Sequence, residues 1–509
     1  MKKEFIMIIV LTSIIVFISL YFGIFSSSKY TRNLITEEEW NNIIDNRKEA
    51  DDLIKDLRFN NQVMFKDKLS NTYFYTLTTY TPNIYYKSIN GHAKFAFKEL
   101  ITDELIEDNK PLKMLIYTKN KYTIIDITVT RLPIINISKT SDHLDKYKTM
   151  MLTLYDGNNT SSKGFIKYRG ASTYIFPKKS YRINLDEHIN MLGLRKDNDW
   201  ILYSAYNDQE KIRNAFASQV WYQMSSTDPA YNIHNSNEYK YVELFINDSY
   251  EGLYMLTYPI DEKVVGMDKG TTNFDEYMFK KVGYKMSEFN IENPYLEDYE
   301  LSSNNPDTLG YTKLAKFYKD TLNTNDIELL YSYINTTNAI DIFIFNNFIQ
   351  GIDHAKDYML KNMYITLKED GKVLYTPWDF DITFGNVFNA ELTNLTDMYK
   401  LDPSANFVMK LNPIYRIRKL GDLSINLLMY NRYQYLRDTV LSDGNIANII
   451  DNYESDIYDS GAFIRDMNKN KDGNYNNPKI KLNKFKTYVL ERLSYLDKYM
   501  ADYIGYSIK

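Results

Sequence analysis

The chain has 509 residues, of which 44% are hydrophobic and 15% aromatic, with a formal net charge of -5 and a pI near 5.8. This length exceeds one ordinary domain, so we expect a large domain and a smaller one. The lack of a basic excess argues against a nucleic-acid partner, and the lack of cysteine excludes disulfides, thiolate zinc sites and a cysteine nucleophile.

The first predicted element is a membrane anchor at residues 1–28. Lys2 and Lys3 precede an uncharged apolar run from Phe5 to Phe25. About 20 apolar residues at about 1.5 Å each span a hydrocarbon core of about 30 Å. The run ends without the small-residue pattern of a signal-peptide cleavage site, so we expect an uncleaved single-pass anchor. The position of the lysines predicts a cytoplasmic N-terminus, with the bulk of the chain outside.

Residues 29–131 are predicted to form a stalk helix and a small β-rich domain. Thr36 followed by Glu39 is a capping box, which predicts the start of a helix. The run from Tyr122 to Thr130 is rich in β-branched residues and predicts a strand.

Residues 132–505 are predicted to be the larger domain, of α+β class. The clearest strands in its first half are Phe165 to Arg169, Tyr181 to Leu185 and Tyr241 to Ile246. Between them, Asp208 to Met224 reads as a helix with Asp208 as N-cap. A hairpin is expected over Leu244 to Met255, turning at Asn247-Asp248.

The second half of this domain starts with a polar stretch from Lys263 to Tyr311, which we expect to be an insertion or a mobile linker. Asn338 to Gln350 is strongly apolar and predicts a helix that ends at Gly351. A hairpin from Asn362 to Pro377 follows, turning at Asp370-Gly371. The region from Asn412 onward is predicted to be mostly helical.

Two carboxylates stand close together in the segment from Pro377 to Gly385. Asp379 and Asp381 are two residues apart, and in an extended segment they project to the same side. Mg²⁺ prefers hard oxygen ligands, commonly one or two carboxylates with phosphate oxygens. The alternative is that one aspartate caps the following turn and the other is a surface charge.

A third aspartate, Asp353, follows the apolar helix directly in a predicted loop. The order of Asp353, a hairpin and then a carboxylate pair is also the order in kinase catalytic loops, where an Asp accepts the hydroxyl proton and an Asn and an Asp hold metal. Asn362 is a candidate amide ligand. The alternative is that Asp353 caps the loop and Asn362 starts a strand. We expect His354 to order this loop rather than bind metal, because the histidines lack zinc-like spacing.

A cationic group lies on or beside two predicted strands: Lys167, Arg169, Lys178, Lys179 and Arg182. Handling of phosphate requires such a group, because Arg offers a planar fork and Lys a point charge. The alternative is an exposed basic edge that discourages sheet aggregation. The chain has no P-loop motif, no G-x-G-x-x-G and no H-R-D, so it is not a typical kinase by motif.

Together these blocks resemble the CotH kinase family, named for a spore-coat protein. The resemblance extends over roughly Leu132 to Tyr499. The matching blocks, in chain order, are Arg169 to Thr173, Pro177 to Arg182, Trp200 to Leu202, Lys211 to Asn214, Val242 to Asn247, Tyr250 to Tyr254, Pro377 to Asp381, Phe384-Gly385 and Arg432 to Arg437.

The resemblance implies a bilobal, atypical protein-kinase-like fold with nucleotide between the lobes, and phosphorylation of proteins with ATP and Mg. It implies that Arg169 and Lys178 or Lys179 contact phosphate. Trp378 would line the nucleotide pocket, or else pack in the core. The hairpin after Gly252 ends without the acidic residue that the family often has there, so the acidic partner of the lysine stays unassigned.

The same resemblance implies that Asp353 is the catalytic aspartate and that Asp379 and Asp381 are metal ligands. The second metal ligand is either Asp357 or Asn362. We therefore expect phosphorylation of Ser or Thr in spore-coat or cell-surface proteins, autophosphorylation included. Two alternatives stay open: a carboxylate-dependent hydrolase, and a non-catalytic surface or coat structural protein on a kinase-like scaffold.

Overall fold

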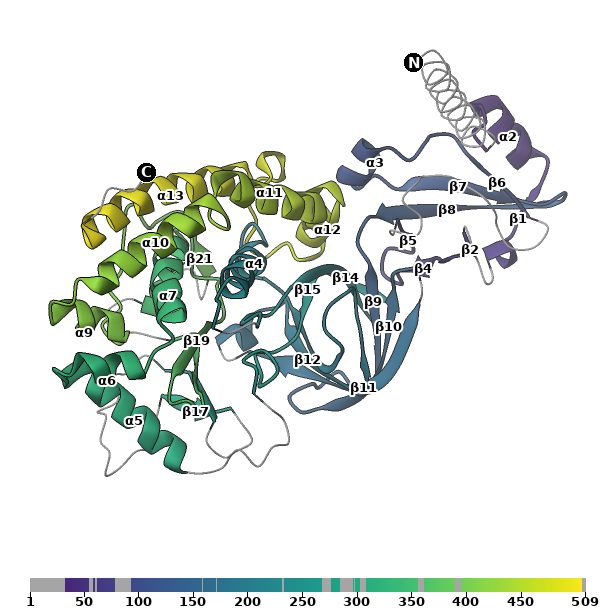
Figure 1. Ribbon diagram of the computed structural model, residues 1–509. Helices are drawn as coiled ribbons and strands as arrows, with labels where there is room; N and C mark the ends of the chain where they lie inside the picture. Colours follow the sequence, from purple (N-terminus) through teal and green to yellow (C-terminus); the bar gives the residue numbers. More distant parts are fainter. Residues whose placement is uncertain are drawn as a thin grey trace, which may run out of the picture.

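The computed structural model describes residues 33–54, 58–59, 62–77, 93–157, 159–170, 172–230, 233–267, 276–283, 296, 298–302, 308–355, 361–389 and 395–505. An N-terminal domain, a β-barrel and a helix-rich part follow one another along the molecule (Figure 1). The predicted anchor at residues 1–28 lies outside the described residues, and none of the helices within them is long and apolar enough to cross a membrane.

The N-terminal domain is a sheet with the strand order β4-β5-β8-β7-β6, in which β1 also pairs with β8. It has a hydrophobic core of its own, which contains Phe59, Phe97 and Met114. The predicted β-rich domain is therefore present as a sheet with a separate core. Its elements are α2 (Glu37–Asp45), β1 (Lys48–Glu49), η1 (Asp51–Ile54), β2 (Arg58–Phe59), β3 (Gln62–Val63), β4 (Phe65–Lys66), β5 (Tyr73–Thr76), β6 (Lys94–Phe97), α3 (Asp103–Glu107), β7 (Leu112–Tyr117) and β8 (Lys121–Thr130).

The capping box predicted at the start of α2 is confirmed. The Glu39 backbone N–H donates to the Thr36 hydroxyl oxygen at 3.2 Å, and the Thr36 backbone N–H donates to the Glu39 carboxylate at 2.8 Å. Two of the N–H groups that a helix start leaves without a partner are satisfied in this way.

The barrel is closed in the order β10-β11-β12-β13-β15-β14-β9. Closure comes from a parallel pairing of β9 with β14, in which Ile134 lies opposite Glu243. The hairpin predicted at Asn247-Asp248 joins β14 to β15, and both turn residues have a positive φ. The barrel strands are β9 (Ile134–Lys139), β10 (Lys148–Tyr155), β11 (Thr160–Arg169), β12 (Ser180–Ile189), β13 (Asp197–Tyr203), β14 (Lys240–Ile246) and β15 (Ser249–Thr257), with η2 (Ser172–Ile175) between β11 and β12.

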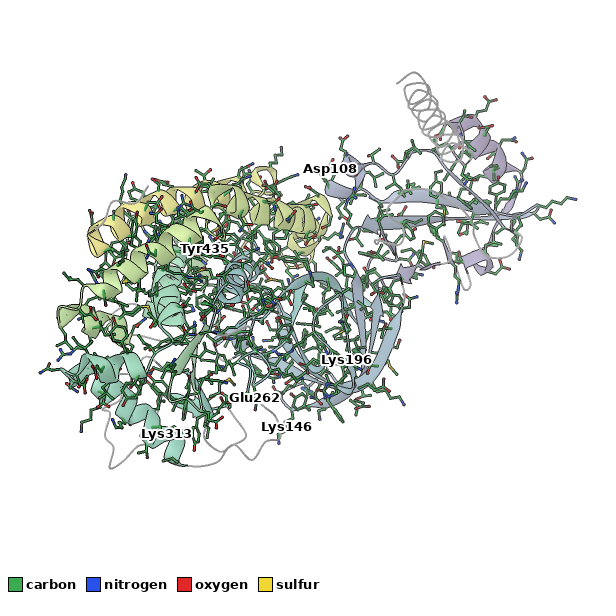
Figure 2. All side chains as sticks on the ribbon, viewed as in Figure 1. Asp108, Lys146, Lys196, Glu262, Lys313 and Tyr435 are labelled. Carbon is green, nitrogen blue, oxygen red and sulfur yellow. The ribbon has the colours of Figure 1, made fainter. Side chains whose placement is uncertain are left out.

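The helix-rich part packs around a sheet with the order β17-β16-β18-β19, and it shares one continuous hydrophobic core with the barrel. Lys313 of α5 lies at its lower edge in Figure 2, and Tyr435 of α10 is exposed. Its strands are β16 (Tyr277–Lys281), β17 (Tyr299–Leu301), β18 (Met363–Leu367), β19 (Val373–Pro377), β20 (Val387–Asn389) and β21 (Leu395–Asp397). Its helices are α4 (Arg213–Ser226), α5 (Thr308–Asn323), α6 (Ile327–Ser332), α7 (Thr336–Ile349), α8 (Ile352–Ala355), α9 (Pro413–Lys419), α10 (Ser424–Asp438), α11 (Asp443–Glu454), η5 (Ser455–Asp459), α12 (Ala462–Lys469), η6 (Pro478–Ile480) and α13 (Asn483–Ile504).

Two expectations for this part need correction. Of the two alternatives for the polar stretch from Lys263 to Tyr311, the mobile linker is wrong for β16 and β17, which lie within it and extend the β18–β19 hairpin into a sheet. The alternative of an insertion stays a prediction. The helix predicted from Asp208 begins at Arg213, because Lys211 has a φ of 61° and breaks the helical path. The Asp208 carboxylate nevertheless accepts the Arg213 backbone N–H at 2.7 Å.

The N-terminal domain is joined to the barrel and to α12 by a buried polar network. Arg465 of α12 forms an ion pair with Glu243 of β14, whose side chains are 3% and 0% exposed, and it also contacts Thr130 of β8 and Asn109. The Thr130 hydroxyl donates to Glu243 at 2.9 Å. The end of α3, marked by Asp108 in Figure 2, accordingly lies beside α12.

Candidate functional site

The segment after β19 leaves the sheet in a strained conformation at Asp379, which has a φ of 66°. A non-glycine residue in the left-handed region is energetically unfavourable and persists only where its surroundings hold it. The Trp378 backbone N–H donates to the Asn362 carbonyl oxygen at 2.9 Å, and the Asn362 side-chain amide donates to the Asp379 carbonyl oxygen at 3.3 Å. The expectation that Asp379 and Asp381 share one side of an extended segment is therefore wrong, because the backbone turns between them.

The loop before α4 and the first turn of α4 hold the backbone turn at Asp379 in place. The Asn207 amide donates to the Asp381 carboxylate at 2.7 Å. Asn214 accepts the Phe380 backbone N–H at 2.9 Å, and Arg213 donates at 3.1 Å to the carbonyl oxygen two residues beyond Asp381. Asn207 before α4 and two side chains in the first turn of α4 thus position the segment that carries both aspartates.

The aspartates gather in a poorly solvated place. Burial and the nearby carboxylates of Asp379, Asp353 and Asp208 together raise the pKa of Asp381 to about 8, although the Asn207 hydrogen bond acts to lower it. The three aspartates predicted from the sequence therefore lie within electrostatic range of one another. Their mutual repulsion would be relieved by a cation.

Asp353 lies on the single turn of α8 rather than in an irregular loop. Its neighbour His354 is completely buried and shares a 3.0 Å hydrogen bond through Nε2 with the Trp378 carbonyl oxygen. The ring also stacks on Phe380, with 5.4 Å between the ring centroids. Burial lowers the pKa of His354 to about 4, so the ring is neutral near pH 7. The prediction that His354 orders this turn is confirmed.

Two cations lie near the segment that carries the paired aspartates. The Arg169 guanidinium lies over the Trp378 ring, 5.2 Å from the centroid, and Trp378 itself packs in the core with 5% exposure. Burial and the charge of Arg169 lower the pKa of Lys280 on β16, whereas the Asp379 and Glu300 carboxylates raise it. Arg169 and Asp379 therefore both lie within electrostatic range of Lys280.

The predicted cationic group does not stay together. Arg182 pairs with Asp199, and the Lys167 ammonium lies 4.5 Å from the centroid of the Tyr147 ring. Lys179 donates to the Tyr174 carbonyl oxygen at 2.5 Å. Of the five predicted cations, Arg169 is the one that contacts the segment with the paired aspartates.

Lys178 is buried and fully engaged by protein atoms. Its ammonium forms an ion pair with Asp466 of α12 at 2.8 Å, with the side chains 1% and 0% exposed. It also donates to the carbonyl oxygens of Ser204 and Leu253 at 3.0 and 2.6 Å. Asp466 is thus the acidic partner that could not be assigned from the sequence, and it comes from a distant helix rather than from the β14–β15 hairpin.

Gly252 makes this partnership possible. It has a φ of 121°, and a Cβ atom placed on it would lie 2.0 Å from the Asp466 carboxylate oxygen. Any side chain there would both strain the backbone and displace the carboxylate. This explains physically why a glycine stands in the Tyr250 to Tyr254 block.

The candidate metal ligands are only partly described. Asp357 lies outside the described residues, so the choice between it and Asn362 stays a prediction. Within the described part of the chain, no group of three or more His, Cys, Asp or Glu side chains is arranged to hold a metal ion. The donors available near Asp379 are therefore two carboxylates and an amide, a set that leaves positions for phosphate and water oxygens.

Several supporting residues had no role in the sequence interpretation. No sequence pattern pointed to Asn207. Asn214 belonged to one of the blocks that resemble the family, but no role was predicted for it. Lys280 lay in the stretch interpreted as a linker, and Asp466 lay in a helical region without a motif. Their roles depend on contacts between segments that are far apart in the sequence.

Comparison with protein families identifies the family of this chain. A family model described as CotH kinase protein matches residues 166–496, which is more than half of the chain. The match begins in β11 and ends in α13, so it includes Arg169, the three aspartates and Asp466. No curated protein matches the chain significantly.

Proposed function

The chain belongs to the CotH kinase family, and on this premise we propose that it transfers the γ-phosphoryl group of ATP to Ser or Thr hydroxyls of proteins, with Mg²⁺ as cofactor. The observation that carries the proposal is the gathering of Asp353, Asp379 and Asp381 beside the cations of Arg169 and Lys280. Carboxylates for a metal and cations for phosphate are the parts that phosphoryl transfer requires.

The residues near Asp379 fit a magnesium ion bound together with phosphates. Asp379 and Asp381 would hold the metal, and the Asn362 amide oxygen is a further donor, since its nitrogen already contacts the Asp379 carbonyl. Bound there, the metal would neutralise charge on the phosphate oxygens during transfer. The raised pKa of Asp381 supports this assignment, because a cation would stabilise its ionised form.

Asp353 is the proposed catalytic base. It would accept a hydrogen bond from the substrate Ser or Thr hydroxyl and orient its oxygen for in-line attack on the γ-phosphorus. The new bond joins the hydroxyl oxygen to phosphorus, and the bond between the γ-phosphorus and the bridging oxygen of ADP breaks. The hydroxyl proton passes to Asp353, and ADP leaves with the electron pair.

We propose that the substrates are spore-coat or cell-surface proteins, including the chain itself, and that the domain works on the outer side of a membrane to which residues 1–28 attach it. This location rests on the apolar run and the preceding lysines. A spore-forming cell with an engulfed compartment would supply nucleotide on that side of the membrane.

The test is incubation of the full-length chain with γ-labelled ATP and Mg²⁺, followed by phosphoamino acid analysis of the chain and of candidate coat proteins. We expect label on Ser or Thr that disappears on chelation and in Asp379→Ala. Unchanged transfer by folded Asp379→Ala would refute the metal assignment. Glycan or ester hydrolysis without nucleotide would point instead to a carboxylate-dependent hydrolase.

A further inference from the structure

Lys178 is poorly placed to contact a nucleotide in this structure. An ammonium has three N–H donors, and Lys178 points them at Asp466, Ser204 and Leu253. Its side chain is 1% exposed. A phosphate group could reach it only if the buried contacts between the barrel and α12 were broken.

Lys280 occupies a different position. In the sheet register it lies opposite Tyr364 of β18 and Glu300 of β17. Paired residues of antiparallel strands project from the same face, and Asn362 precedes Tyr364 by two residues. Lys280 thus lies near the end of β18 at which Asn362 stands.

Lys281, the next residue of the strand, projects from the other face. It forms an ion pair with Asp298 at 2.9 Å. The two adjacent lysines therefore differ in their partners. The ion pair with Asp298 explains why Lys281 is buried, but no ion pair explains the partial burial of Lys280 within the described residues.

Within the described part of the chain, the side chains of two cations at the site have no acceptor. The Lys280 ammonium and the Arg169 guanidinium form no hydrogen bond and no ion pair there, although Lys280 lies within electrostatic range of Asp379 and Arg169 lies over the neighbouring Trp378 ring. Glu300 acts on Lys280 through its charge without an ion pair. A partly buried cation without an acceptor is unfavourable, and a second cation beside it adds repulsion. A bound polyanion would supply acceptors to both cations and cancel the repulsion between them.

We propose that Lys280 of β16, together with Arg169 of β11, binds the polyphosphate tail of the nucleotide, and that Lys178 is a structural residue. This inference rests on the proposed function. The Arg169 fork would grip two phosphate oxygens while Lys280 supplies a point charge, and Asp379 lies close to both. Because β11 belongs to the barrel and β16 to the four-stranded sheet, the bound polyphosphate would contact both parts of the fold.

The experiment is calorimetric titration of the full-length chain with Mg²⁺-tripolyphosphate, Mg²⁺-ATP and adenosine. Lys280→Gln keeps the length of the side chain and removes its charge, and Lys280→Arg restores a cation. Lys163→Gln is the matched control, because Lys163 is exposed on the same strand as Arg169. Circular dichroism of each variant verifies its fold.

We expect Lys280→Gln and Arg169→Gln each to weaken tripolyphosphate and ATP binding at least about tenfold, as the loss of a charged hydrogen bond does. Adenosine binding should be unchanged in both, Lys280→Arg should recover most of the affinity, and Lys163→Gln should bind like the wild type. Wild-type affinity in Lys280→Gln would overturn the inference. So would a folded Lys178→Met that loses tripolyphosphate binding.

The two proposals fail separately. A wild-type chain that binds tripolyphosphate through Lys280 but transfers no label from ATP would refute the proposed kinase activity and leave the polyphosphate site intact. A chain whose labelling of Ser or Thr has the same KM for ATP in Lys280→Gln as in the wild type would refute the role of Lys280 alone.

Discussion

Replacing Lys178 with methionine is expected to lower the free energy of unfolding by about 3 to 5 kcal/mol. The pair that it breaks is one of the most deeply buried in the described structure, with Lys178 and Asp466 1% and 0% exposed. Removing one member of a buried ion pair leaves the other charge uncompensated, and this is the usual magnitude of that effect. Two carbonyl oxygens, those of Ser204 and Leu253, would also lose their donor.

The assay is urea unfolding followed by tryptophan fluorescence, since Trp200 and Trp221 are completely buried. Lys179→Met is the matched control, and we expect it to change the unfolding free energy by less than about 1 kcal/mol, since its contacts are at the surface. The double variant Lys178→Met/Asp466→Asn should lose about 2 kcal/mol less free energy of unfolding than the sum of the losses in the two single variants.

One result would refute the structural role of Lys178. If Lys178→Met unfolded within about 0.5 kcal/mol of the wild type and had lost Mg²⁺-ATP binding, the side chain would have to act in the nucleotide site. The pairing with Asp466 would then be incidental.

Three further outcomes are expected. Asn207→Ala removes the hydrogen bond that stabilises the ionised form of Asp381, so Mg²⁺-ATP affinity measured by calorimetry should fall about tenfold at pH 7, and an unchanged affinity would contradict this role. Burial lowers the pKa of His354 from 6.5 to about 4 in the folded chain. As the pH falls from 7 to 5, the unfolded chain binds a proton at this ring and the folded chain does not, so the free energy of unfolding should fall by about 2 kcal/mol because of this group. His354→Asn should lose that part of the pH dependence in urea titrations, and an identical slope would show that the ring is not buried. Arg465→Ala leaves Glu243 buried without its cation, so the melting temperature should fall and proteolysis should separate the N-terminal domain from the barrel, whereas wild-type resistance would show that the network does not hold them together.

Local chemistry made much of the fold predictable. The capping box at Thr36, the turn at Asn247-Asp248 and the hairpin that turns at Gly371 each depend on residues within a few positions of one another, and all three are present. The start of the helix predicted at Asp208 was wrong for the opposite reason. Its first residues are held by contacts to other segments, and Lys211 donates to three backbone carbonyl oxygens, one of them at position 474.

The proximity of the three aspartates could be predicted, because the sequence motifs contain the carboxylates themselves. Asp353, Asp379 and Asp381 do lie near one another, although Asp379 arrives there through a left-handed backbone rather than an extended one. The cations were not predictable in the same way. The family resemblance pointed to Lys178 or Lys179, and the burial of Lys178 against Asp466 could be known only from the fold.

Lys280 shows the limit most clearly. Its strand has five residues within a long polar stretch, too short for its alternation to stand out, and it pairs with β18, which lies far along the chain. Strand pairing over such a separation is set by the closed fold rather than by local preference. A residue whose role comes from pairing of this kind leaves no signal in its own neighbourhood.

The most direct test of the central claim is calorimetry of ATP binding to the full-length chain with and without Mg²⁺, in the wild type, Asp379→Ala and Asp353→Asn. We predict that binding requires Mg²⁺, that Asp379→Ala abolishes this requirement together with most of the affinity, and that Asp353→Asn binds normally while failing to transfer label. ATP binding that is equally strong with chelator, or unaffected by Asp379→Ala, would contradict the account.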